Sequence, residues 1–143
     1  MGDPFDLARF VEAQDGGGTY ERALAELRGG RKTSHWMWFV FPQIAGLGRS
    51  PMAVRYAISG LDEARAYVAH PVLGPRLRAC AEALLVAGSA GRSAVGILGE
   101  VDALKLRSSM TLFARAAPDE AVFASVLARF YDGVPDPETE RRL

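Results

Sequence analysis

Two short segments of this sequence carry side chains that could bind or process an anion. The first, residues 31–43, places cations, hydroxyls and an imidazole directly before a group of aromatic residues. If Thr33 or Ser34 caps a helix, the backbone N–H groups beside it form an anion site. An indole ring could stack on a flat ligand, and the His35 imidazole could transfer a proton. The ligand-binding candidates in this segment are Arg31, Lys32, Ser34, Trp36, Trp38 and Gln43.

In the second segment, residues 102–111, helical spacing would bring polar side chains together. On a helix, Asp102, Lys105 and Ser109 share one face at i, i+3 and i+7, and Ser108 lies beside them. An ammonium, a carboxylate and two hydroxyls together suit a phosphate or a sugar. For a hydrolytic reaction, Asp102 or His35 would be the base and Lys105 the electrostatic stabiliser, with both serines binding the ligand.

Both segments also have a plainer interpretation. The aromatic residues of the first segment could belong to the core, with the cations covering its edge. Asp102 and Lys105 could form an ordinary solvated ion pair, which contributes about 0–1 kcal/mol. A composite site requires the two segments to meet in space, and spacing within each segment does not decide this.

The two lysines of the chain lie one in each of these segments. Fifteen of the seventeen basic residues are arginine, and the two lysines are Lys32 and Lys105. A lysine in such an arginine-rich chain can mark a place that needs a compact ammonium in place of a planar fork. Chance placement is the alternative.

The other histidine and the single cysteine are predicted to have structural roles. His70 precedes Pro71 at the end of a predicted helix, where an imidazole commonly caps backbone carbonyls. Cys80 lies on an apolar helix face and is predicted to be an inert core thiol. Two histidines without metal-ligand spacing predict no metal site, and no cofactor is predicted.

Composition predicts one globular domain spanning residues 1–143. Hydrophobic residues make up 49% and charged residues 24%, and the formal net charge is zero. The scattered basic residues argue against nucleic-acid or anionic-membrane binding, which require a strong positive field. A single cysteine, no signal peptide and no apolar run of about 18–20 residues predict a cytoplasmic protein that does not cross a membrane.

The elements that must position these residues are predicted to be helices. Apolar spacing and Gly or Pro boundaries predict an all-α domain of about seven to eight short-to-medium helices, without a convincing strand. Residues 34–41 are apolar nearly all round, so periodicity leaves helix and strand open there. The other predicted helical ranges are 4–14, 19–28, 51–59, 61–70, 72–87, 102–116 and 118–131.

Several long motifs resemble one small bacterial family, the domain of unknown function numbered eighteen-ten. The motifs cover residues 3–14, 30–48, 56–58, 62–64, 70–74 and 105–113. The resemblance implies a compact α-helical fold and supplies no accepted reaction. The label "calpastatin", sometimes attached to this family, does not fit, because that inhibitor is long, repetitive and disordered. The chain has Glu100-Val101-Asp102 where the family usually has a Pro-Asp pair, which leaves the start of the helix carrying Lys105 open.

Three functions compete at this point. The first is binding or processing of a phosphorylated small molecule, such as a nucleotide or an ADP-ribose-like group. The second is a helical protein-interaction module without catalytic activity, whose signature would be exposed aromatic residues within 36–41. Nucleic-acid recognition is third, because no helix clusters Arg and Lys. The sequence leaves the oligomeric state open.

Overall fold

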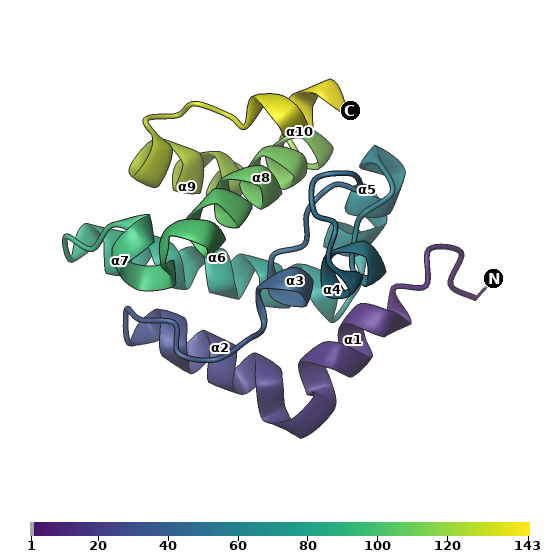
Figure 1. Cartoon of the computed structure of the whole chain (residues 1–143), viewed down its shortest axis with the longest axis horizontal. Coiled ribbons are helices and arrows are strands. Elements are labelled where there is room, and N and C mark those ends of the chain that lie inside the picture. Colours follow the sequence, from purple (N-terminus) through teal and green to yellow (C-terminus); the bar gives the residue numbers. More distant parts are fainter. Residues whose placement is uncertain (1) are drawn as a thin grey trace.

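The computed structural model describes residues 2–143, and the regular elements in this range are helices, which confirms the predicted all-α fold class (Figure 1). Within this range the strand-like contact is an isolated parallel bridge between Ile44 and Ile58. None of the helices among the described residues combines the length and the hydrophobicity that a membrane span requires. The helical elements are α1 (Ala8–Asp15), η1 (Gly16–Gly18), α2 (Thr19–Arg28), α3 (Met37–Val40), α4 (Pro51–Arg55), α5 (Leu61–Ala69), α6 (Leu73–Ser89), α7 (Ala94–Leu98), α8 (Glu100–Ala116), α9 (Ala121–Tyr131) and α10 (Pro137–Arg141).

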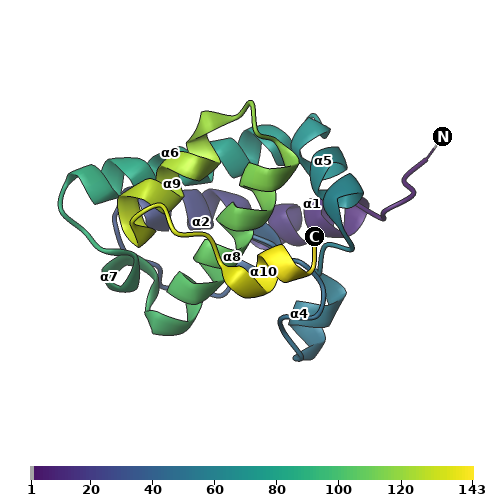
Figure 2. The same cartoon turned by 90° about the horizontal axis from the view of Figure 1, so that it is seen from above.

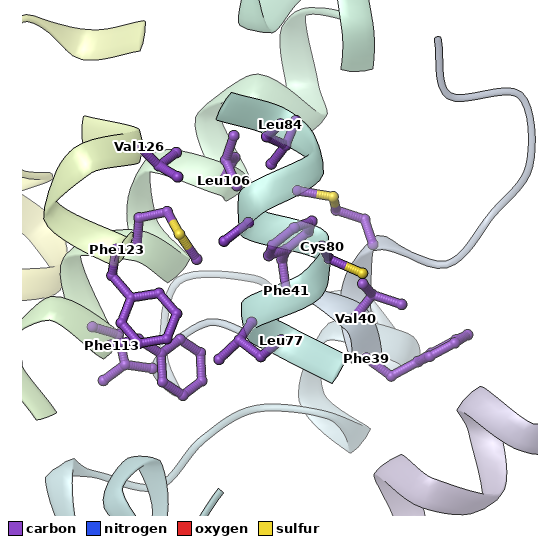
Figure 3. Packing of buried hydrophobic residues seen from close by; sticks show 14 of the residues in the cluster. Phe39, Val40, Phe41, Leu77, Cys80, Leu84, Leu106, Phe113, Phe123 and Val126 are labelled. Carbon is purple, nitrogen blue, oxygen red and sulfur yellow. The ribbon is translucent and has the colours of Figure 1, made fainter. Parts of the chain in front are cut away.

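Helix α8 is the central element of the fold. It packs against α5, α7, α9 and α10, and all six residues from 108 to 113 are buried. Figure 3 shows the surrounding core, where Phe113 and Phe123 face each other and Cys80 lies among apolar side chains. The predicted core position of Cys80 is confirmed, and burial raises the pKa of its thiol to about 12, as expected for an unreactive thiol.

The predicted helix over 51–59 is too long. Helix α4 ends at Arg55, and the chain then extends so that Ile58 N donates to Gln43 O at 2.8 Å. Ala45 N donates in turn to Ile58 O at 2.8 Å. The side chain of Ile58 is buried and therefore continues the apolar spacing of the helix. Its backbone N–H and C=O, however, form hydrogen bonds with residues 43 and 45 and not with a helix. This pairing fixes residues 43–48 beside α4.

The segment whose structure the sequence left open, 34–41, contains a single helical turn. Helix α3 begins at Met37, with Trp36 as its N-cap, and ends at Val40. Neither Thr33 nor Ser34 caps it, which changes the anion site expected there.

His70 has a structural role, but at a different helix end from the one predicted. Its Nδ1 accepts hydrogen bonds from Val72 N at 3.0 Å and Leu73 N at 3.2 Å. These are free N–H groups at the start of α6. The imidazole therefore caps the following helix and does not cap the carbonyls of the preceding one.

Polar side chains of α8 hold the C-terminal segment, which runs along that helix in Figure 2. Arg107 donates to Val134 O at 3.0 Å and to Pro135 O at 2.9 Å. Thr111 Oγ1 accepts from Asp136 N at 2.9 Å. At the far end, the Arg142 guanidinium donates to Gly46 O at 3.4 Å. These bonds bring α10, α8 and the 43–48 loop together around one hollow.

Candidate functional site

Lys32 and Lys105 meet at a shared carboxylate. Lys32 Nζ lies 2.9 Å from Asp102 Oδ2, and Lys105 Nζ lies 3.6 Å from Asp102 Oδ1. The three side chains are 10%, 24% and 17% exposed for Lys32, Lys105 and Asp102, respectively. The structure thus brings the two polar segments together, and the cluster of Lys32, Asp102 and Lys105 keeps one net positive charge.

Each lysine also lies against an indole ring. Lys32 Nζ is 5.1 Å from the Trp36 ring centroid, and Lys105 Nζ is 5.0 Å from that of Trp38. Both distances are within the range of cation–π attraction. The backbone fixes this arrangement, because Lys32 N donates to Ile97 O of α7 at 2.7 Å, and α7 leads directly into α8.

The anion site expected at Thr33 and Ser34 is filled by the protein's own Glu26. Its carboxylate accepts from Thr33 N at 2.8 Å, Ser34 N at 3.0 Å and Trp36 Nε1 at 2.9 Å, and also from the Ser34 hydroxyl. Burial alone would raise the pKa of Glu26, but these four hydrogen bonds outweigh it and lower the pKa to about 2. Ser34 and the two amides are therefore not free to bind an external anion.

The aromatic group is core, apart from one ring. Trp36, Phe39 and Phe41 are buried, whereas Trp38 is partly exposed. No face of Trp36 is therefore open for stacking on a ligand in this structure. The exposed aromatic patch that would mark an interaction module is not found among residues 36–41.

Two further candidates of the first segment lie at the surface. Arg31 and His35 are exposed. Within the described chain, no side-chain hydrogen bond or ion pair links either residue to the cluster of Lys32, Asp102 and Lys105.

The two serines of α8 have different surroundings, and neither lies open to solvent. The Ser108 hydroxyl donates to Asp136 Oδ2 at 3.1 Å and to Leu104 O at 3.3 Å. Ser109 is completely buried, and its hydroxyl has no hydrogen-bond partner in residues 2–143. Ser108 therefore holds the C-terminal segment, and Ser109 lies inside the core.

Lys105 also borders a surface groove of about 330 Å³ between α8, the 43–48 loop and the C-terminal segment. The groove is lined by Gln43, Leu47, Gly48, Val101, Leu104, Lys105, Arg107, Ser108, Asp136 and Glu138. This volume lies at the lower end of the range for small-molecule sites.

Most polar groups of the groove already have partners in the protein. Arg107 and Ser108 bind the C-terminal segment as described above. Asp136 Oδ2 accepts from Thr139 N and the Thr139 hydroxyl, and Glu138 pairs with two arginines, Arg141 and Arg142. Among the described residues, no side-chain hydrogen bond involves Lys105 or Gln43, so these two remain available to a ligand.

Comparison with known proteins identifies the family. Residues 4–143 match a family model described as a protein of unknown function, DUF1810. The chain belongs to the DUF1810 family. The family predicted from the sequence motifs is thus confirmed. The chain is also similar to a solved structure, the conserved hypothetical protein Rv1873 from Mycobacterium tuberculosis, with 53% sequence identity and a TM-score of 0.93. That match covers 99% of this chain and 98% of the other. No curated protein matches.

In this member of the DUF1810 family, the missing proline before Asp102 does not delay the helix. Helix α8 begins at Glu100 after Gly99, whose φ of +87° lies in the region that favours glycine. Asp102 therefore lies in the first turn of α8, where the helix dipole favours a carboxylate.

Proposed function

We propose that this protein binds a phosphorylated small molecule, such as a nucleotide or an ADP-ribose-like group, with Lys105 as the main anion ligand. The observation that carries the proposal is the state of the Lys105 ammonium. The Lys105 side chain is 24% exposed and borders the groove, and its Nζ atom lies 3.6 Å from Asp102 Oδ1. An ammonium has three donors, and 3.6 Å is too long for a hydrogen bond to use one.

In this proposal Asp102 is a positioning residue and not a base. Each of its oxygens faces a different lysine, at 2.9 and 3.6 Å. Lys32 lies closer to the carboxylate and compensates its negative charge. The positive charge of Lys105 is therefore available to a ligand. A phosphate next to Lys105 would therefore meet a cluster with one net positive charge, and ionised hydrogen-bond partners make the stronger bonds.

A thermal-shift measurement tests the proposal. Wild-type protein is titrated with inorganic phosphate, ribose 5-phosphate, AMP and ADP-ribose. A ligand at 100 times its Kd adds about 2.7 kcal/mol. For 143 residues, each kcal/mol raises Tm by about 3 °C, so a bound ligand gives about 8 °C.

Two variants decide whether the shift belongs to Lys105. Lys105→Met should abolish it. Arg65→Met is the matched control, because Arg65 is also the cation of an i,i+3 ion pair on a helix, with Asp62. It should keep the wild-type shift. No shift with any of the four compounds, or the same shift in Lys105→Met, would contradict the proposal.

A further inference from the structure

We infer that the ligand of this groove is an organic phosphate with an apolar body, which lies along Val101 and Leu104 while its phosphate binds Lys105. This inference rests on the proposed function and adds the class of ligand. It follows from the side chains that line the groove next to the ammonium.

The apolar wall is built on one face of α8. Val101, Leu104 and Lys105 follow each other at i, i+3 and i+4, so they are neighbours on the helix surface. Val101 is 66% exposed and Leu104 67% exposed, although both line the groove. Leu47 faces them from the 43–48 loop and is partly buried against the core. A phosphate bound to Lys105 would therefore have apolar surface directly beside it.

The acidic residues of the groove do not form a cation site. Asp136 and Glu138 are engaged with Ser108, Thr139, Arg141 and Arg142, so they present no free pair of carboxylates for a cation. Arg107 is fixed by two backbone carbonyls. These bonds use two of the five N–H donors of Arg107. Lys105 is the charged group of the groove that makes no side-chain hydrogen bond within the described residues.

Gln43 supplies the remaining polar contact. Its backbone is fixed by the bond from Ile58 N to Gln43 O, and its amide can both donate and accept. A ligand body with a hydrogen-bonding edge would pair with this amide. Inorganic phosphate or a bare sugar phosphate would leave the exposed faces of Val101 and Leu104 uncovered. An apolar body would remove these faces from water, which favours binding.

The test compares two probes by calorimetric titration, inorganic phosphate and phenyl phosphate, in mildly alkaline buffer where both are dianions. They then differ by one apolar ring. Wild-type protein should bind phenyl phosphate about tenfold tighter than phosphate, because the ring covers the apolar wall. Leu104→Ser should weaken the binding of phenyl phosphate about fivefold and leave the affinity for inorganic phosphate unchanged. Leu104 is largely exposed, so this variant should fold. Val86→Ser on α6 is the matched control, because Val86 is 72% exposed on another helix, and it should change neither affinity.

The outcomes separate the inference from the proposed function. If both probes bind equally and both are lost in Lys105→Met, the anion site stands and the apolar body is refuted. Binding of neither probe overturns both. If Leu104→Ser leaves phenyl phosphate unchanged but alters the oligomeric mass in solution, the apolar wall belongs to an interface between copies, and the inference is wrong.

Discussion

Replacing Asp102 with asparagine tests whether the Lys32–Asp102–Lys105 cluster is a desolvated unit. The variant removes the carboxylate charge and leaves two ammonium groups facing an amide. Lys32 is the more affected, since its side chain is only 10% exposed and its nitrogen is 2.9 Å from the carboxylate. Breaking a fully buried ion pair costs about 3–5 kcal/mol, whereas an exposed pair contributes about 0–1 kcal/mol. For this mostly buried pair we expect a loss of about 2–3 kcal/mol.

The expected change in Tm follows from chain length. An unfolding entropy of about 2.1 cal/mol/K per residue gives about 0.3 kcal/mol/K for 143 residues. Asp102→Asn should therefore lower Tm by about 7–10 °C, measured by circular dichroism at pH 7. Asp62→Asn is the matched control, because it removes a carboxylate from an i,i+3 pair whose Asp62 side chain is 88% exposed. It should lower Tm by less than about 2 °C.

A double-mutant cycle separates the ion pair from local helix effects. Lys32→Met with Asp102→Asn should cost clearly less than the sum of the two single variants, because the second substitution removes an already uncompensated charge. The reasoning is refuted if Asp102→Asn lowers Tm no more than Asp62→Asn, or if the two substitutions are additive.

Three further predictions concern polar side chains with structural roles. Glu26→Gln should lower the free energy of unfolding by about 1–3 kcal/mol at pH 7. In the wild type the Glu26 contribution is complete above pH about 4.5 and is lost as pH falls through its folded pKa of about 2, so acid titrations of the two proteins should converge at low pH. His70→Ala should lower Tm by about 3 °C, as expected for loss of a helix cap worth about 1 kcal/mol; an unchanged Tm would exclude this role. Ser109→Ala should leave Tm unchanged or raise it, because the buried hydroxyl has no partner in residues 2–143. Ser108→Ala should lower Tm by about 3 °C, and the reverse order of the two serine variants would contradict the assignment.

Helical spacing predicted the local half of the site. The i,i+3 relation of Asp102 and Lys105 requires only that residues 102–116 form a helix, and α8 contains them. The contact with Lys32 is tertiary, because it depends on the packing of the 30–33 segment against α7. Rare lysine usage pointed to both residues without giving their distance.

The sequence could not predict which polar groups the protein itself would use. Ser109 shares a helix face with Asp102 and Lys105, but the second half of α8 is covered by α5, α9 and α10, so that face becomes core. The backbone N–H groups of Thr33 and Ser34 donate to the Glu26 carboxylate of α2. No local sequence pattern predicts these hydrogen bonds. The apolar groove wall was also missed, because Val101 and Leu104 resemble ordinary helix residues until their exposure is known.

The most direct test of the anion site uses the two lysines as probes. With ¹³C-labelled lysine, the Cε signals of the chain come from Lys32 and Lys105 alone, and Lys32→Arg assigns them. On titration with phenyl phosphate, the Lys105 signal should shift and saturate, while the Lys32 signal, held by Asp102 at 2.9 Å, should move much less. A Lys105 signal that does not saturate, or a saturating shift confined to Lys32, would contradict the account.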